Sequence, residues 1–328
     1  MREFQLYSVG HALVDIFIDV NDDEFSSLGF ERGTMRLVDA DEQRQLLARF
    51  QRHDPRLISG GSVANSTFAF AQLGGAAALL GCVGDDRYGL FYREEFERQG
   101  VDVGNPVIYN ATTGTCVCLI TPDAERTMRT CLAVSSHVDA KHVDEARLSR
   151  SEWLFLEGFM FTNGEVGRAA VREAVRVAKK HGVKVAVTCS EAFVVQHFGD
   201  IFHEILAQTD LLFANASEAK AATGASDAAS AFAALRSLVP SAVVTDGPHG
   251  AYVRYGGEET HVPAFACTPV DLTGAGDMLA GTFLYGITHG TAPRQALRAA
   301  CYLATKVITQ VGARLHHGVK EAWAEALA

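Results

Sequence analysis

A short run near the C-terminal end of the chain combines residue types that can bind an anion and move a proton. Residues 270–281 read VDLTGAGDMLAG, in which Gly274, Ala275 and Gly276 directly precede Asp277 and an apolar helical run. A helix begins with unpaired N–H groups and a partial positive charge, and small residues let a ligand approach that backbone closely. We expect this stretch to cradle an anion or a charged transition state; the plainer alternative is a tight turn whose aspartate stabilises the helix start.

The carboxylate of Asp277 has a chemical role beside such an anion. Next to a phosphoryl group in transfer, it can accept a proton from an attacking alcohol, while the N–H groups of residues 274–277 stabilise charge on the equatorial oxygens. The repulsion between Asp277 and a polyphosphate must be offset by cations, for which we expect Mg²⁺ with Arg126 as a helper. The P-loop pattern is absent, and the three glycines from Gly274 to Gly281 are spaced two residues too widely for a dinucleotide fingerprint.

A second glycine-rich helix start lies in the N-terminal part. Residues 59–66 read SGGSVANS, where Gly60 and Gly61 expose backbone and Asn65 follows about one helical turn later. Asp15, at the end of the strand-like GHALVDI, is an acceptor suited to two adjacent hydroxyls. A sugar fits these partners. The plainer alternative is a loop, a solvated helix residue and a turn residue.

The elements that must position these residues alternate along the chain. Between residues 152 and 312, short apolar runs are separated by amphipathic helical patterns, which is typical of βαβ units and a mainly parallel sheet. We expect strands at 153–159, 183–189, 210–214 and 242–247, and helices near 164–181, 199–207, 276–290 and 293–311. In the first part, YSVGHALVDIFIDV is strand-like, SVANSTFAFAQLGG is a helix ending at Gly74–Gly75, and AAALLGCVGDD is a strand and turn.

Two segments of the first part depart from this alternation. Residues 13–37 and 105–130 contain short alternating strands where helices would be expected. We expect these segments to pair as a small sheet lying over the body as a lid. Neither an internal repeat nor a low-complexity linker is visible, so residues 1–328 are predicted to form a single α/β domain with the lid inserted.

The composition excludes several classes of protein. The chain has 328 residues, of which 48% are hydrophobic, and its net charge of −10 comes without a stripe of basic residues, which argues against nucleic-acid binding. Apolar runs fall short of the ~18 residues of a membrane span, and the N-terminus lacks a signal-peptide pattern. We therefore expect a cytoplasmic protein whose partners are small molecules rather than nucleic acid or membrane, as a monomer or a homodimer.

The seven cysteines suggest packing rather than chemistry. They contain no C-x-x-C pair, so neither a zinc site nor a thioredoxin-type redox pair is indicated. Cys116 and Cys118 lie two apart in TGTCVCLIT, which reads as a strand. Because a free cysteine behaves as a small hydrophobic residue, we interpret this pair as packing on one strand face.

Taken together, these motifs resemble those of the ribokinase-like (PfkB) family of carbohydrate and nucleoside kinases, over nearly the whole chain. The resemblance rests on the signatures DLTGAGDMLAGTFLYG and GGSVANSTFAFAQLGG, the latter followed by GCVGDDRYG. It implies a three-layer α/β/α sandwich with a mainly parallel sheet and a small β-sheet lid. It also implies ATP as co-substrate, Mg²⁺, and in many members a monovalent cation such as K⁺.

The resemblance assigns roles to residues at the reacting centre. Asp277 corresponds to the catalytic base, and the residues from Gly274 to Gly276, with Ala275 between them, correspond to the anion hole. Asp271 occupies the position that helps to bind the monovalent cation, and Thr273 lies beside the phosphates. Leu272 is a departure, because threonine is common there.

The resemblance also assigns residues to the nucleotide. NASE, residues 215–218, matches the N-x-x-E motif associated with magnesium and phosphate, with Asn215 near phosphate and Glu218 contacting Mg²⁺ through water; the same spacing is also a helix capping box. VVTDGPHGAYV places Thr245 and Gly247 near phosphate or ribose, and QVGAR places Gly312 where the family closes its adenine pocket.

Within the family, the chain looks most like the adenosine kinases. The features are GHALVDI, GTMRLVD, TGTCVCLIT with an arginine-containing turn after it, and LFANASEA. The candidates for apolar contact with a purine are Met35, Leu37, Cys118, Phe159 and Met160; for each of them the alternative is a plain core residue. His11 stands where many adenosine kinases have asparagine; it is a candidate ribose or base contact or a satisfied strand residue.

These observations predict an ATP-dependent kinase for the 5′-hydroxyl of a purine ribonucleoside, adenosine above all, in purine salvage. The alternatives on the same machinery are a ribose or fructose kinase and an inosine or guanosine kinase. A catalytically silent nucleoside- or sugar-binding sensor is a further alternative, against which the intact Asp277 motif argues. A dehydrogenase would need the dinucleotide fingerprint that this chain lacks.

Overall fold

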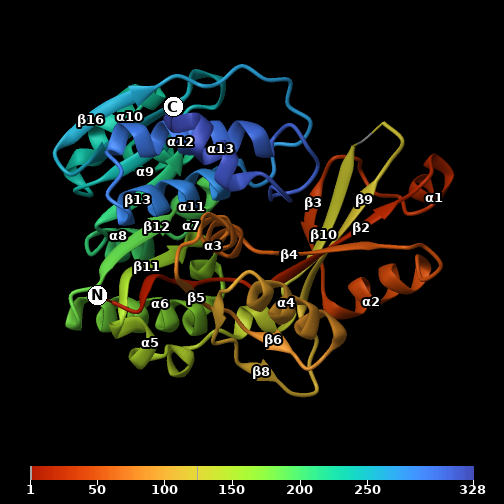
Figure 1. Cartoon of the computed structure of the whole chain (residues 1–328). Helices are drawn as coiled ribbons and strands as arrows, with labels where there is room; N and C mark the ends of the chain where they lie inside the picture. Colours follow the sequence, from red (N-terminus) through yellow and green to blue (C-terminus); the bar gives the residue numbers. More distant parts are fainter. Residues whose placement is uncertain (1, 124) are drawn as a thin grey trace.

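A computed structural model describes residues 2–123 and 125–328, and its centre is a nine-stranded sheet (Figure 1). In their order across the sheet the strands are β16 (Glu258–Val262), β15 (Ala251–Tyr255), β14 (Ala242–Thr245), β13 (Leu211–Asn215), β12 (Lys184–Thr188), β11 (Ser151–Glu157), β1 (Phe4–Val9), β5 (Ala77–Leu80) and β7 (Asp102–Val103). From β14 to β7 all neighbours are parallel, whereas β14, β15 and β16 pair in antiparallel fashion. The predicted mainly parallel sheet is confirmed, and VVTDGPHGAYV forms β14, a turn and β15.

Each central strand is apolar on both faces because helices cover both faces of the sheet. In β11, Leu154 and Leu156 pack into the hydrophobic core on one side, and Trp153 and Phe155 pack into the core on the other. Such a strand reads as a continuous hydrophobic run, since neither face meets water. This explains why runs such as WLFLEGF could be recognised from sequence.

The helices form two layers around the sheet (Figure 1). The first layer holds α5 (Glu145–Ser149), α6 (Gly164–Lys180), α7 (Ala192–His197), α8 (Gly199–Leu206), α9 (Ala216–Thr223) and α10 (Ala228–Ala234). The second holds α3 (Ser62–Leu73), α11 (Ala275–Thr288), α12 (Pro293–Val307) and α13 (Val319–Leu327). Short 3₁₀ turns are η1 (Ala133–His137), η2 (Ala140–His142), η3 (Gly158–Thr162), η4 (Leu235–Ser237) and η5 (Gly247–His249). None of the helices in the described part of the chain is long and apolar enough to span a membrane.

A smaller, five-stranded sheet projects from one side of the body (Figure 1). Its order is β3 (Met35–Leu37), β10 (Arg126–Cys131), β9 (Gly114–Ile120), β2 (Leu13–Asp19) and β4 (Arg56–Gly60). Its helices are α1 (Asp22–Ser26), α2 (Ala40–Arg49) and α4 (Arg87–Arg98). The strand β4 was not predicted, and β8 (Val107–Ile108), inside the expected 105–130 segment, pairs instead with β6 (Val83–Gly84).

The two faces of the smaller sheet differ in character. Along β2, Val14 and Ile16 pack into a core with α2 and α4, whereas Asp15 and Phe17 point to the opposite face. That opposite face continues onto β9 through Cys116, which is paired in register with Asp15. The period of two therefore places Val14 and Ile16 in the smaller sheet's own core and Asp15 and Phe17 on its other face.

The chain crosses between the two sheets near Gly61. YSVGHALVDIFIDV, expected as one strand-like run, divides into β1 and β2, which belong to different sheets. Gly61 joins β4 to α3 with φ 109°, and a side chain there would collide with the carbonyl oxygen of His11. Only glycine accepts both constraints. Gly61 therefore allows the β4–α3 connection to lie directly against the β1–β2 connection.

Candidate active site

The start of α11 offers backbone N–H groups without a capping side chain. Its N-cap is Gly274, with φ 78° and no side-chain cap hydrogen bond. A Cβ at Gly274 would lie 2.5 Å from the Cα of Ala313, whereas one at Gly276 would have none of the described residues within 4 Å. The helix start is thus tightly held on one side and open on the other, which is the arrangement that an anion needs.

Asp277 joins the two glycine-rich motifs. One of its carboxylate oxygens accepts a hydrogen bond of 2.9 Å from Ser62 Oγ, and the other accepts one of 3.0 Å from Asn65 Nδ2. Helices α3 and α11 pack closely there, since a side chain at Gly281 would collide with the carbonyl oxygen of Ser66. Burial raises the pKa of Asp277 to about 6, and the two hydrogen bonds act against that rise. A carboxylate of this kind is a competent proton acceptor at neutral pH.

Asp15 lies across from this centre on the inner face of the smaller sheet. A Cβ at Gly60 would come within 2.8 Å of the Asp15 carboxylate, so Gly60 leaves room for that group. Burial raises the pKa of Asp15 to about 6, the positive charges of Arg314 and Arg126 act against the rise, and the charge of Asp277 adds to it. The predicted sugar-binding aspartate and the predicted base therefore share one electrostatic environment.

Glu157, which the sequence did not single out, lies at the end of β11 and hydrogen-bonds to two other segments, at His11 and at Val63. Its Oε1 accepts hydrogen bonds from the backbone N–H (2.8 Å) and Nδ1 (2.6 Å) of His11, and its Oε2 accepts one from the N–H of Val63 (3.1 Å). The side chain of Glu157 is fully buried. Burial lowers the pKa of His11, but the hydrogen bond and charge of Glu157 outweigh it and raise the pKa above the ordinary value. His11 Nε2 also contacts the Asn163 amide, so the imidazole ring is held in a fixed orientation from both sides.

Arg314 is the second residue that sequence reasoning missed. Its Nε donates to Asn65 Oδ1 at 3.0 Å, and its Nη1 donates to Ser59 Oγ at 2.8 Å. Its guanidinium carbon lies 4.1 Å from the ring centroid of Phe68 and 5.0 Å from that of Phe96. Arg314 therefore fixes the amide of Asn65 with its nitrogen toward Asp277. No local pattern around QVGAR indicates this role, because Arg314 and Asn65 are 249 residues apart.

Arg126 reaches from the smaller sheet to the loop before α11. It pairs with both carboxylate oxygens of Asp271, and its Nη2 donates to Thr273 Oγ1 at 2.8 Å. The N–H groups of Thr273 and Gly312 each donate to Asp271 at 2.8 Å. Asp271 is therefore engaged by an arginine and two backbone groups, and the K⁺ contact expected for it stays a prediction.

Asn215 and Glu218 form a helix capping box at the start of α9. Glu218 N–H donates to Asn215 Oδ1 at 2.9 Å, Asn215 N–H donates to Glu218 Oε2 at 2.8 Å, and Asn215 Nδ2 donates to Glu218 Oε1 at 2.7 Å. Burial raises the pKa of Glu218 to about 7. Because both carboxylate oxygens are already bonded, the residues fit Mg²⁺ through an intervening water better than by direct coordination. Thr245 is paired in register with Asn215, and Gly247 follows on the next turn.

The five residues expected to contact a base lie in three places: Cys118 on β9, Met35 and Leu37 on β3, and Phe159 and Met160 after β11. Phe17, Cys116 and Cys118 form a small apolar cluster on the inner face of the smaller sheet, with Ile58, Ile120 and Met128 packed against it. On β3 at the sheet edge, Met35 and Leu37 are 55% and 59% exposed.

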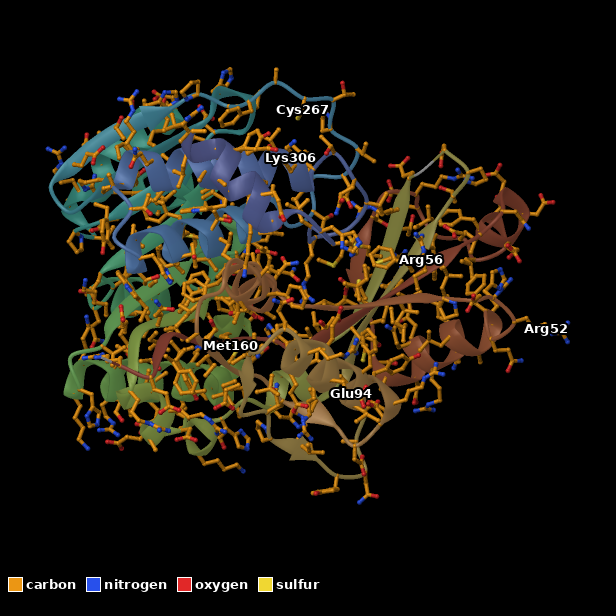
Figure 2. All side chains as sticks on the ribbon, in the orientation of Figure 1. Arg52, Arg56, Glu94, Met160, Cys267 and Lys306 are labelled. Carbon is orange, nitrogen blue, oxygen red and sulfur yellow. The ribbon has the colours of Figure 1, made fainter. Side chains whose placement is uncertain are left out.

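Phe159 and Met160 lie after β11. Phe159 is half-buried beside Phe193, with ring centroids 6.3 Å apart. Met160 is fully buried in the core of the body, where Figure 2 labels it. A ligand has no surface of Met160 to touch, so the prediction of substrate contact is wrong for this residue and the plain-core alternative holds.

Comparison with known proteins agrees with this architecture. Residues 34–317 match the family described as pfkB family carbohydrate kinase. The solved structure of adenosine kinase from Sinorhizobium meliloti has 30% sequence identity and a TM-score of 0.87 over 99% of each chain. The ribokinase of Haemophilus influenzae is 26% identical over 79% of this chain and 84% of its own length. The adenosine kinase of Saccharomyces cerevisiae is 26% identical over 94% of this chain and 95% of its own length.

The fold and the matched relatives define a phosphotransferase that acts on a hydroxyl group of a sugar or a nucleoside. The chain belongs to the pfkB family of carbohydrate kinases. Kinases of this family use ATP as the phosphoryl donor.

Proposed function

We propose that this protein phosphorylates the 5′-hydroxyl of a purine ribonucleoside, with adenosine converted to AMP as the main reaction. The observation that carries the kinase assignment is the position of Asp277. Its carboxylate is fixed by Ser62 and Asn65 at the first turn of α11, beside N–H groups that have no side-chain cap. A proton acceptor and an anion site therefore adjoin each other, as in-line phosphoryl transfer requires.

The preference for a nucleoside over a free sugar rests on the inner face of the smaller sheet. Asp15 is paired in register with Cys116, and Phe17 with Cys118, so apolar surface begins directly beside the carboxylate. A ribose bound at Asp15 would have its base over Phe17 and Cys118. A free sugar has no group that gains from such a surface. The alignment with the yeast adenosine kinase also spans more of this chain than the alignment with the ribokinase.

The proposed reaction needs three actions from this chain. Asp15, Gly61 and Asn65 hold the ribose, while the smaller sheet acts as a lid over the base and excludes water. Asp277 takes the proton of the 5′-hydroxyl as its oxygen bonds to the γ-phosphorus and the bond to the β,γ-bridging oxygen of ATP breaks. The N–H groups of residues 274–277 stabilise the charge on the transferred group.

The remaining predicted residues surround the nucleotide in this proposal. Arg126, Thr273 and Gly312 would border the phosphates, and Asn215, Thr245 and Gly247 would line the path of the ribose and phosphates of ATP. Mg²⁺ would neutralise the polyphosphate, with Glu218 holding one of its waters.

A substrate panel tests the proposal. The reduced full-length protein is assayed with ATP and Mg²⁺ against adenosine, inosine, guanosine, ribose and fructose, and kcat/KM is compared. We expect kcat/KM for adenosine to exceed kcat/KM for ribose by at least about 100-fold. This ratio corresponds to roughly 3 kcal/mol, which is the free energy expected from burying the apolar surface of the base. Ribokinase similarity makes ribose the second candidate. A higher kcat/KM for ribose or fructose would overturn base recognition, and absence of transfer to every acceptor would overturn the kinase itself.

A further inference from the structure

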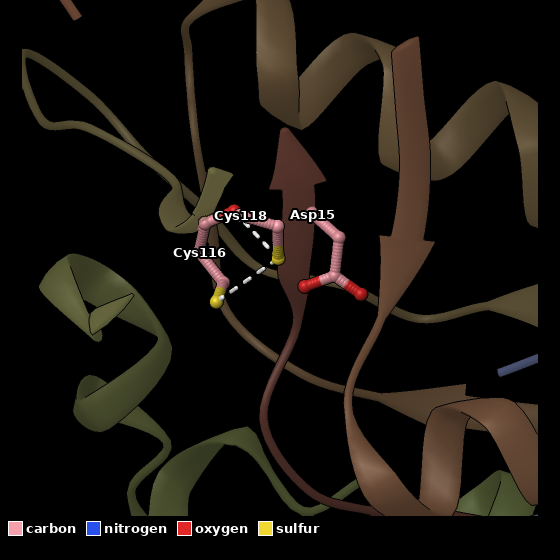
Figure 3. Close-up of side chains that lie close together, drawn as sticks. All are labelled: Asp15, Cys116 and Cys118. Carbon is pink, nitrogen blue, oxygen red and sulfur yellow. Dashed lines mark hydrogen bonds between the residues drawn. The ribbon is translucent and has the colours of Figure 1, made fainter. Parts of the chain in front are cut away.

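Two thiols and a carboxylate meet on the inner face of the smaller sheet (Figure 3). Cys116 and Cys118 are on β9 and Asp15 is on the neighbouring β2, and one ligand atom from each lies within 4.8 Å of the others. The two sulfur atoms are 3.7 Å apart. Both cysteines are nearly buried, at 6% and 3% exposure.

The spacing of the two sulfur atoms suits a tetrahedral metal centre. Zinc–sulfur bonds of about 2.3 Å at a tetrahedral angle place two sulfur ligands roughly 3.8 Å apart. The observed 3.7 Å therefore allows Cys116 and Cys118 to bind one ion without a change of rotamer. Thr130, on β10, donates a hydrogen bond of 3.1 Å to Cys116 Sγ and helps to hold it in place.

The register of the strands explains why the carboxylate shares this face. Asp15 pairs with Cys116 in the parallel β2–β9 ladder, so their side chains point the same way. Zinc bonds of about 2.0 Å to oxygen and about 2.3 Å to sulfur place the oxygen roughly 3.5 Å from each sulfur. The three ligand atoms already lie within 4.8 Å of one another, so a three-ligand set needs a small adjustment of the Asp15 side chain.

We propose that Asp15, Cys116 and Cys118 bind one thiophilic divalent cation of the Zn²⁺ class. Two thiol protons are released to solvent, two metal–sulfur bonds and one metal–oxygen bond form, and water takes the fourth position, with no change of oxidation state. The sequence pattern alone gave no such indication, because C-x-C lacks the spacing of a structural zinc motif.

The site has a consequence for activity that rests on the proposed function. If Asp15 holds the ribose, a cation bound to its carboxylate occupies the place of the nucleoside. Zn²⁺ would then inhibit competitively against the nucleoside and not against ATP. In the proposed function the ATP phosphates would lie at the start of α11, a subsite separate from the one that holds the ribose at Asp15.

Cadmium binding tests the site directly, without any measurement of catalysis. The reduced full-length protein is titrated with Cd²⁺, and the ultraviolet charge-transfer absorbance of cadmium–thiolate bonds is recorded. We expect one ion per chain with the intensity of two thiolates. In the Cys116→Ala/Cys118→Ala variant the affinity for Cd²⁺ should fall by more than the roughly 10- to 100-fold lost when a residue that only hydrogen-bonds to a metal ligand is removed.

The exposed Cys267 provides the matched control. It lies on a loop of the body, labelled in Figure 2, and Cys267→Ser should keep the full signal. Thermal unfolding of each variant confirms that it is folded. Persistence of the signal in the double variant, its loss in Cys267→Ser, or no signal in the parent protein would overturn the proposal.

Competition separates this proposal from the proposed function. Displacement of Cd²⁺ by excess adenosine supports both the site and its overlap with the nucleoside. A two-thiolate signal that adenosine does not displace supports the metal site and contradicts the placement of the nucleoside at Asp15. A single Asp15→Asn variant should keep the thiolate absorbance with weakened affinity; an unchanged affinity would remove Asp15 from the ligand set.

Discussion

Replacement of Arg314 by methionine tests whether a buried arginine positions the proton acceptor. Arg314 donates to Asn65 Oδ1 at 3.0 Å, and Asn65 Nδ2 donates to Asp277 at 3.0 Å, so the arginine acts on the base through the amide. Methionine keeps an unbranched stem between Phe68 and Phe96 but removes the donors. The amide of Asn65 is then free to turn its oxygen toward the carboxylate.

The size of the effect follows from the hydrogen bonds that are lost. A hydrogen bond to a charged group contributes about 1.5–3 kcal/mol, which corresponds to roughly 10- to 150-fold in kcat. The hydrogen bond from Asn65 and the charge of Arg314 both act to lower the pKa of Asp277. Their loss should raise that pKa further above about 6 and shift the acid limb of kcat/KM to higher pH.

Steady-state kinetics with the best acceptor of the panel, measured from pH 5 to 9, gives both quantities for Arg314→Met. Arg98→Met is the matched control. Arg98 and Arg314 both line a surface cavity between α4 and the 314–316 segment, but Arg98 is exposed, and its hydrogen bond within the described residues goes to the Glu94 carbonyl. A purely structural role would lower stability without moving the acid limb. Unchanged kcat and an unmoved acid limb in Arg314→Met, or equal losses in Arg98→Met, would refute the reasoning.

Three further substitutions separate backbone geometry from chemistry. Gly274→Ala should lower the free energy of unfolding by about 1–3 kcal/mol or more. Alanine disfavours φ 78°, and its Cβ would lie 2.5 Å from Ala313 Cα. An unchanged melting temperature would contradict this. Gly276→Ala should unfold at the parental temperature, since within the described part of the chain a Cβ there has no neighbour closer than 4 Å. It should nevertheless lose activity, because the methyl group obstructs the phosphate; full activity would argue against an anion at this place. Glu157→Gln should cost about 1–3 kcal/mol of stability in denaturant titrations, because one of the N–H donors on His11 or Val63 then faces an amide nitrogen; equal stability would show that these bonds matter little.

Much of the body could be predicted from sequence because its signals are local. Strands buried on both faces read as apolar runs, and α3 ends at Gly74 in a left-handed conformation as its Gly-Gly pair indicated. The sequence assigned Asp277 to the base and Asn65 to the sugar, but it predicted no contact between the two side chains. The structure supplies the hydrogen bond between them, 212 residues apart in the chain.

What the sequence did not indicate depends on contacts between distant segments. Arg314 and Glu157 act through single long-range hydrogen bonds, which leave no periodic or motif signal. The strand β4 was missed because only part of RLISG is apolar and its partner, β2, is far along the chain. Met160 was assigned to the substrate from a loose alignment, although it follows a strand directly into the core. Asp271 pairs with Arg126 because the smaller sheet approaches the α11 loop, which no local pattern could show.

The role of Asp277 is tested most directly by Asp277→Asn, with nucleoside affinity measured alongside phosphoryl transfer. Asparagine keeps the shape of the side chain but cannot accept the hydroxyl proton at neutral pH. We predict an adenosine dissociation constant close to that of the parent protein and a kcat lowered by about 100- to 10,000-fold. A variant that binds adenosine and still turns over at nearly the parental kcat would contradict the assignment of this carboxylate as the base.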